Sequence, residues 1–194
     1  LGRVEVPLEN FYKGIIRRQG GVVCERFLDS VQEFALEFLA TDDGVSFAGY
    51  SLFVSEKGGY SGNLMASDVE LEKILSLHIP LEVIENVREN LCDILSSLLN
   101  GSGYNGYLGV DMMIYRDADG NTRLNPCMEI NMRMNMGVAA RRIYDRHVLP
   151  GRRGRFFIKF HKNKGDALAE HVYNAGKYPA EYEDGRISGG YLCL

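Results

Sequence analysis

The sequence lacks any apolar run that approaches the roughly 18 to 20 residues needed by a membrane-spanning helix. Its N-terminus also lacks the charged-then-apolar pattern of a secretory signal. What remains is a chain of 194 residues with 45% hydrophobic content, which is long enough for one domain with a substantial core. We therefore expect a globular protein with no membrane partner.

Clustered cysteine and histidine side chains are also missing. The four cysteines show no Cys-x-x-Cys spacing, and the four histidines are equally scattered. These residues are Cys24, Cys92, Cys127, Cys193, His78, His147, His161 and His171. The scatter argues against a zinc site. Because the cysteines mostly lie within apolar patterns, we interpret them as reduced, buried thiols of a cytoplasmic protein.

A strong excess of charge of one sign is absent from the chain as a whole. The formal net charge of −4 argues against a general nucleic-acid binder. Residues 141–164 are locally basic, with Asp145 as their one acid. The basic residues there are Arg141, Arg142, Arg146, Arg152, Arg153, Arg155, Lys159, Lys162 and Lys164. Two interpretations stay open: a solvated helix end and loop, or a field that attracts a nucleotide or an acidic substrate.

Hydrophobic periodicity and turn residues predict an α+β architecture, an antiparallel sheet with helices packed on one face. Strands are expected at residues 22–27, 34–40, 45–54, 107–115, 123–134 and 155–161, with a turn at 41–44 and a loop at 55–60. Helices are expected at residues 79–99, 136–148 and 166–175. Pro80 suits the first position of the first helix.

No internal repeat or low-complexity linker divides the chain. We therefore expect residues 1–194 to form a single domain, with residues 179–194 as a weakly patterned tail. Because the chain begins with Leu rather than Met, we expect the domain to be truncated at its N-terminus.

The most informative stretch is residues 128–134, with the sequence Met-Glu-Ile-Asn-Met-Arg-Met. Side chains at alternate positions of a strand point to one face of the sheet. Glu129, Asn131 and Arg133 therefore lie together, and the methionines face the other way. One interpretation is an amphipathic strand whose polar side chains simply face water.

A second interpretation is a metal site, which depends on the register of a β-hairpin. The Asp-Gly and Gly-Asn steps around Gly120 are strong hairpin-turn signals. If the loop is odd-numbered and centred on Gly120, Asp111 lies directly opposite Glu129. Two like charges at that separation, about 5 Å between Cβ atoms, destabilise a sheet unless a cation neutralises them. Asp111, Glu129 and the Asn131 amide oxygen are hard donors that suit Mg²⁺ or Mn²⁺.

These residues resemble the C-terminal lobe of the ATP-grasp superfamily. Its enzymes hold two Mg²⁺ ions with an acidic residue on one strand and a Glu-x-Asn pair on the next. The matching positions here are Asp111, Glu129 and Asn131. The resemblance implies the same α+β fold and covers roughly the last lobe of it.

Upstream residues match the nucleotide-binding part of that family in the same order. Residues 22–28 resemble the strand and hinge that hold adenine, and a Glu eight residues after the hinge Glu resembles the one that binds the ribose hydroxyls. The matching residues are Glu25, Arg26, Phe27, Leu28 and Glu33. The alternative is that Glu25 and Glu33 are exposed charges at the ends of strands.

The chain departs from the family pattern at three places. Asn63 stands where many members carry a Lys or His that reaches the phosphates, and Gly109 stands where many ligases carry an Arg. Arg133 is then the one arginine expected at the reacting phosphoryl group. The family's phosphate-binding Lys and Gly-rich lid lie well upstream of the hinge, whereas Lys13 is not in a strand-like context and residues 1–4 match at most the tail of such a lid. The chain alone is therefore expected to be inactive.

The resemblance implies the Mg-ATP-binding portion of a ligase that activates a carboxylate as an acyl phosphate for attack by an amine or similar nucleophile. The implied cofactors are ATP and Mg (or Mn), and the implied partners are ATP and an unidentified carboxylate. The sequence leaves a homo-oligomer open. The alternative is a non-catalytic nucleotide-binding or protein-interaction module derived from this fold, which Asn63 and Gly109 favour. A third interpretation is a plain α+β scaffold with coincidental polar strands.

Overall fold

The computed structural model describes residues 9–56 and 59–193 and contains a six-stranded sheet with the strand order β5-β4-β1-β2-β3-β6. Every pair of neighbouring strands in it is antiparallel. The strands are β1 (Asp29–Thr41), β2 (Gly44–Glu56), β3 (Gly59–Met65), β4 (Gly106–Arg116), β5 (Thr122–Asn131) and β6 (Gly154–Phe156). The α+β architecture with an antiparallel sheet is thus confirmed.

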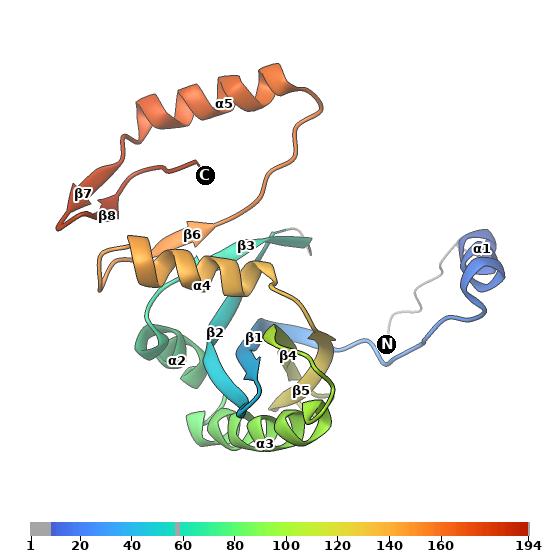
Figure 1. Cartoon of the computed structure of the whole chain (residues 1–194). Coiled ribbons are helices and arrows are strands. Elements are labelled where there is room, and N and C mark those ends of the chain that lie inside the picture. Colours follow the sequence, from blue (N-terminus) through green and yellow to red (C-terminus); the bar gives the residue numbers. More distant parts are fainter. Residues whose placement is uncertain (1–8, 57–58, 194) are drawn as a thin grey trace.

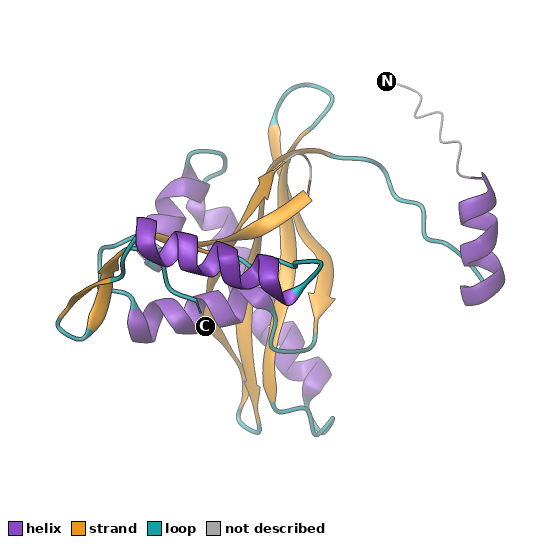
Figure 2. Cartoon of the chain, turned by 90° about the horizontal axis from the view of Figure 1, so that it is seen from above, coloured by secondary structure: helices purple, strands orange, loops and turns teal. Residues whose placement is uncertain are grey.

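Helices α2 (Asp68–Ser76) and α3 (Leu81–Leu99) cover one face of the sheet, and α4 (Met136–His147) lies across the other, as Figures 1 and 2 show. A layer of helices on one face was expected, and α3 matches a helix predicted for it. Helix α4 adds a second layer, so that the middle strands are buried on both sides. This second layer shapes the functional site described below.

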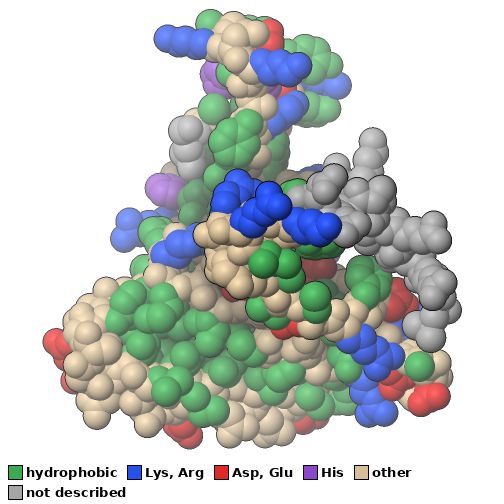
Figure 3. Space-filling view, turned by 90° about the vertical axis from the view of Figure 1, so that its right-hand side faces the viewer, with side chains coloured by type: hydrophobic (Ala, Val, Ile, Leu, Met, Phe, Trp, Pro, Cys, Tyr) green, Lys and Arg blue, Asp and Glu red, His purple; other side chains and the backbone are tan. Residues whose placement is uncertain are grey.

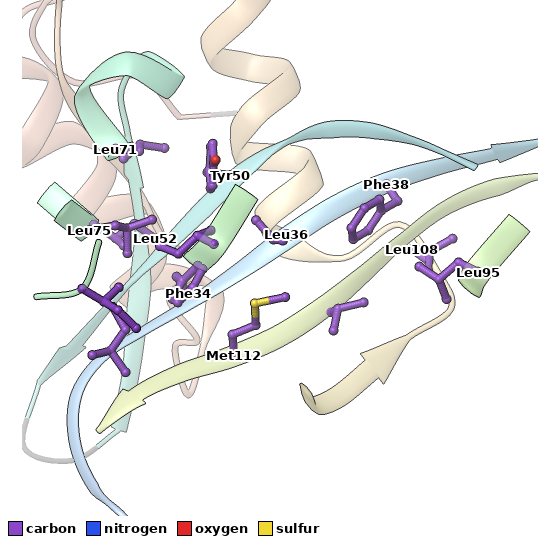
Figure 4. Close-up of a cluster of buried hydrophobic side chains, with 14 of the residues drawn as sticks. Phe34, Leu36, Phe38, Tyr50, Leu52, Leu71, Leu75, Leu95, Leu108 and Met112 are labelled. Atoms are coloured by element: carbon purple, nitrogen blue, oxygen red, sulfur yellow. The ribbon is translucent and has the colours of Figure 1, made fainter. Parts of the chain in front are cut away.

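The main core lies between the sheet and helices α2 and α3. Phe34, Leu36 and Phe38 alternate along β1, are fully buried and point toward this layer (Figure 4). Leu71 and Leu75 of α2 pack against them from the helix side. Burying a side chain of this size stabilises the fold by about 1.5–3 kcal/mol. The alternation therefore fixes which face of β1 points into the core, and hence which residues remain for the opposite face.

Two helix starts differ from the sequence-based expectation. Pro80 is the N-cap of α3 and not its first residue, because its ψ of 133° is extended and not helical. Helix α2 was not expected at all, although Ser67 accepts a hydrogen bond from the Glu70 backbone N–H and so caps it. Ser-x-x-Glu is the spacing of a capping box, which is the signal that marks this short helix.

The strand expected at residues 22–27 is wrong. Residues 21–28 have no regular structure, and Val23 and Phe27 are 87% and 94% exposed. No strand of the described part of the chain pairs with them, and an extended segment without a partner makes no ladder. Helix α1 (Glu9–Gln19) precedes this segment and lies apart from the sheet (Figure 1). Lys13 is part of this helix.

After β6, which pairs with β3, the C-terminal part also lies apart from the sheet. The expected strand 155–161 is shortened to β6, and α5 (Lys164–Lys177) buries no residue. The tail forms the hairpin of β7 (Glu181–Glu183) and β8 (Arg186–Gly189), which is tied to the end of α4 by the Leu149 N–H bonding to the Ile187 carbonyl. Figure 3 shows this part rising above the body of the molecule, with hydrophobic side chains gathered on the body below.

The interpretation of the cysteines as buried is wrong for three of them. Cys24, Cys127 and Cys193 are exposed, and Cys92 is half-buried. The three exposed thiols lie in an irregular segment, on the edge strand β5 and near the C-terminus, where no second layer covers the chain. Across the described ranges, no helix is both long enough and apolar enough to span a bilayer.

Candidate functional site

Strands β4 and β5 place Asp111 directly opposite Glu129, as the sequence predicts. The register near the turn, however, differs from the expected one. Near the turn Tyr115 pairs with Arg123, so the five-residue loop is centred one residue before Gly120. Strand β5 then inserts two extra residues before it reaches Glu129. Because the insertion has an even number of residues, the side chains of β5 stay on the same faces of the sheet. Asp111 and Glu129 are therefore paired as predicted, although the loop is centred one residue earlier than expected.

The insertion occurs around Pro126. The Asn125 side-chain oxygen accepts a hydrogen bond from the Cys127 N–H over 3.3 Å, so the chain turns locally there. Proline has no N–H to donate to the neighbouring strand, and such residues are found at irregular or edge positions of sheets. The register resumes at Glu129 and continues to Asn131, which pairs with Gly109.

The polar side chains of this hairpin form a chain of hydrogen bonds. Asn131 Nδ2 donates to Asp111 Oδ2 over 3.2 Å, and an Arg133 Nη atom donates to Asn131 Oδ1 over 3.0 Å. The strand expected at residues 123–134 is shorter than predicted: β5 ends at Asn131, so Arg133 lies beyond the observed strand but still reaches the cluster. The structure thus brings together the four residues Asp111, Glu129, Asn131 and Arg133, which we call the hairpin cluster.

The hairpin cluster carries unbalanced negative charge. Burial, and after it the nearby Glu129 carboxylate, raise the pKa of Asp111 to about 6, while Arg133 and the Asn131 hydrogen bond oppose this rise. Glu33 contributes to the raised pKa as well, because it lies on β1 beside β4 and on the same face as Asp111. The cluster is therefore an arrangement that a cation would stabilise.

The donor set is small. Among the described residues, no three His, Cys, Asp or Glu side chains gather as a metal-binding group. The hairpin cluster instead offers two carboxylates and one amide oxygen. Oxygen-only sets of this kind are typical for Mg²⁺, which keeps several waters and takes phosphate oxygens as further ligands.

The residues expected to bind the nucleotide do not form a compact group with the hairpin cluster. Glu25, Arg26 and Phe27 are exposed and Leu28 is half-buried, all in the irregular segment that leads into β1. No hydrogen bond or ion pair within the described ranges links these four to the hairpin cluster. Their assignment to an adenine hinge stays a prediction, as does the assignment of Glu33 to ribose.

Asn63 lies in a different place from the hairpin cluster. It is 1% exposed on β3, and its Nδ2 donates to Ser51 Oγ of β2 over 2.6 Å. Strands β1 and β2 separate it from β4 and β5. The structure therefore buries Asn63 beneath α4 and does not bring it to the carboxylates.

At least four of the nine basic residues in the stretch 141–164 form ion pairs with described residues. Arg141 contacts Asp68 and Asp145, Arg153 lies 2.9 Å from Glu70, and Lys159 lies 2.6 Å from Glu170. Acids on α2, α4 and α5 thus neutralise much of the local positive charge. This arrangement favours the structural interpretation of the stretch over a field that attracts substrates.

Two polar residues next to the hairpin cluster, Glu37 and Asn135, were not predicted from the sequence. Glu37 of β1 is 1% exposed, and Asn135, the N-cap of α4, donates from Nδ2 to Glu37 Oε2 over 2.8 Å. Burial raises the pKa of Glu37 to about 7, against the lowering effect of the Asn135 hydrogen bond. A charged residue inside the otherwise apolar run 34–40 was the available signal.

No family model matches the sequence, and no curated protein matches it. Solved structures do. The N5-carboxyaminoimidazole synthetase from Staphylococcus aureus, complexed with ADP, is 13% identical with a TM-score of 0.41, covering 85% of this chain and 46% of that one. The synthase from Aspergillus clavatus, in complex with ADP and 5-aminoimidazole ribonucleotide, is 14% identical with a TM-score of 0.42, covering 86% of this chain and 46% of that one.

This chain therefore spans less than half the length of those proteins. Similarity at this level is too low to carry a function across.

Proposed function

We propose that this chain is the Mg-ATP-binding portion of an ATP-grasp ligase that activates a carboxylate as an acyl phosphate. One observation carries the proposal: Asp111 stands opposite Glu129, with Asn131 bonded to Asp111 on the same face. The raised pKa of Asp111 supports it, because the opposed carboxylates have a cost that a bound divalent cation would remove.

Asp111, Glu129 and Asn131 would hold the cation, and Mg²⁺ or Mn²⁺ fits their oxygen atoms. When bound, the cation would neutralise phosphate charge and orient the nucleotide. Asn131 now donates to Asp111 and accepts from Arg133. Turning this amide over would present its oxygen to the carboxylate side and would release Arg133 toward a phosphate.

In the proposed reaction, an oxygen of the substrate carboxylate attacks the γ-phosphorus of ATP and the bond to the bridging oxygen breaks. ADP leaves, and an acyl phosphate forms. An amine or similar nucleophile then attacks the acyl carbon, and phosphate leaves with the C–O bond pair. Such steps depend on positioning and charge, so the role of Arg133 is to stabilise negative charge on the transferring group.

A non-catalytic binding module is the second candidate. Two observations favour it: Gly109 supplies no cation at the position where many ligases carry Arg, and Asn63 is buried away from the hairpin cluster. Because this chain alone is expected to be inactive, the two candidates are compared in a protein that also carries an upstream phosphate-binding lobe. Nucleotide binding without ADP formation there, across a panel of carboxylates and amines, would favour the module over the ligase.

The test is the thermal midpoint of the chain with ADP, with and without Mg²⁺. A ligand that binds only the folded state raises the thermal midpoint. At a ligand concentration a hundredfold above Kd, it increases the free energy of unfolding by about 2.7 kcal/mol. We expect a rise that needs Mg²⁺ and is lost in Glu129→Gln. Glu183→Gln, an exposed change on β7, is the matched control and should keep the rise. A wild-type midpoint that ADP and Mg²⁺ together leave unchanged would contradict the proposal.

A further inference from the structure

Glu37 is a buried carboxylate to which the side chain of Asn135 donates a hydrogen bond. It lies on the face of β1 opposite the main core, beneath the start of α4, and Asn135 donates to its Oε2. Its Oε1 has no hydrogen-bond partner among the described residues. Burying an ionisable group with so little compensation costs free energy, so packing alone does not account for the residue.

Asn135 connects this carboxylate to the helix and to the hairpin cluster. Its Oδ1 accepts from the Val138 N–H over 2.8 Å and so caps α4, while its Nδ2 donates to Glu37. The oxygen and the nitrogen of the Asn135 side-chain amide therefore both form hydrogen bonds. Asn135 also follows Asn131 and Arg133 by only a few residues, so its position limits where the intervening backbone can run.

Two glycines make room for this arrangement. A side-chain carbon at Gly109 would collide with Asn135 Nδ2 and with the Glu37 carboxylate, and one at Gly137 would collide with Glu37 Oε1 and Ser51 Oγ. Gly109 pairs with Glu37 on one side and with Asn131 on the other. The chain after β5 can thus fold back over β4 because position 109 has no side chain.

We propose that Glu37 is a positioning residue for the hairpin cluster. Through Asn135 it fixes the connection between β5 and α4, and with it Asn131 and Arg133, relative to Asp111. This role rests on the proposed function, since positioning matters only if the cluster binds a metal and nucleotide. It also gives a reason for Gly109: the space that an arginine would fill is taken by Asn135 and Glu37.

Reversing the donor and acceptor of the Asn135–Glu37 hydrogen bond tests the positioning role of Glu37. Asn135→Asp keeps an oxygen that caps α4, because Asp is as good an N-cap as Asn. It removes the donor to Glu37 and sets two carboxyl groups against each other. Adding Glu37→Gln restores a donor–acceptor pair with the roles reversed. Because hydrogen bonds that involve charged groups are among the stronger ones, we expect Asn135→Asp to weaken Mg²⁺–ADP affinity roughly 10- to 100-fold and the double variant to recover most of it.

Asn163→Asp is the matched control, because Asn163 caps α5 and also donates to a carboxylate, that of Asp166. It should leave Mg²⁺–ADP affinity unchanged. Undiminished affinity in Asn135→Asp, or a loss that the double variant does not rescue, would overturn the positioning role while leaving the proposed function intact.

A second readout needs no ligand. In nuclear magnetic resonance spectra of the chain without metal or nucleotide, the Asn131 amide and Arg133 guanidinium signals should shift in Asn135→Asp and return in the double variant. Unchanged signals would overturn the positioning role even if the wild type failed to bind ADP, an outcome that by itself contradicts only the proposed function.

Discussion

Asp111 is held at a cost to stability. Its carboxylate faces that of Glu129 across the strand pair, and like charges directly opposite each other destabilise a sheet by about 0.2–1 kcal/mol. In the absence of divalent cations, we expect Asp111→Asn to raise the thermal midpoint near neutral pH. The rise should be about 2–4 °C if the charge contributes about 1 kcal/mol.

The same substitution should abolish the Mg²⁺-dependent midpoint rise with ADP. Thermal scans with and without Mg²⁺ check both effects on one sample. A lower metal-free midpoint in Asp111→Asn would show that the Asp111 charge is stabilising and would remove the argument for a cation there.

Glu37 predicts a pH dependence of stability. Its pKa is raised from 4.5 to about 7 in the folded state, so between these values the folded chain holds a proton that the unfolded chain has lost. Stability therefore falls as pH rises through this window and is level above it. Urea unfolding at about pH 5 and about pH 8 should show the wild type losing stability relative to Glu37→Gln. Equal losses in both proteins would assign the dependence to other groups.

Individual residues differ in how far the sequence predicts them. Strand parity and the turn residues predicted the pairing of Asp111 with Glu129, but the pairing holds because the two-residue insertion around Pro126, which was not predicted, offsets a loop centred one residue earlier than expected. The burial of Glu37 was not predictable in the same way. It depends on α4, which comes about a hundred residues later and covers that face of β1.

At the scale of elements, the contact between α4 and the sheet depends on Gly137. A methyl group there would collide with Glu37 and Ser51, which are backed by strands β1 and β2. We expect Gly137→Ala to lower the free energy of unfolding by about 1–3 kcal/mol through overpacking. Gly176→Ala is the control: it also lies in a helix, but open space surrounds it, so the change should be neutral or stabilising. Urea unfolding of both variants measures the difference.

Elements with strong periodicity were predicted well, and elements that depend on partners were not. The long helix α3 follows from its recurring apolar positions, and β1 and β2 follow from the turn between them. The segment 22–27 has the composition of a strand, but composition cannot supply the neighbouring strand that a ladder requires. Helix α2 is too short for its periodicity to stand out, and only its cap marks it.

For the molecule as a whole, the core between the sheet and the α2–α3 layer should dominate stability. Leu36→Ala is expected to cost about 2–5 kcal/mol, because the side chain is fully buried and its loss leaves a cavity. Phe27→Ala removes a larger side chain that is 94% exposed, so its effect should stay within about 0.5 kcal/mol. Chemical denaturation of the two variants provides the comparison. A large loss in Phe27→Ala would mean that residues 21–28 pack against something in solution.

The overall arrangement leaves the hairpin cluster open on one side. Helix α4 covers β2 and β3 on that face, whereas β5 is the edge strand and Glu129 is exposed. Helices α1 and α5 lie apart from the sheet (Figure 1). A bulky ligand can therefore approach Asp111 and Glu129 from the edge.

The two-residue insertion at Pro126 also bears on how this hairpin can change during evolution. One codon added or lost between positions 117 and 128 would turn Glu129 and Asn131 away from Asp111, whereas a change of two codons would keep them in place. Length variation in related genes should therefore be even-numbered here wherever the carboxylate pair is under selection. An odd-numbered change would mark a lineage in which that pair has lost its use.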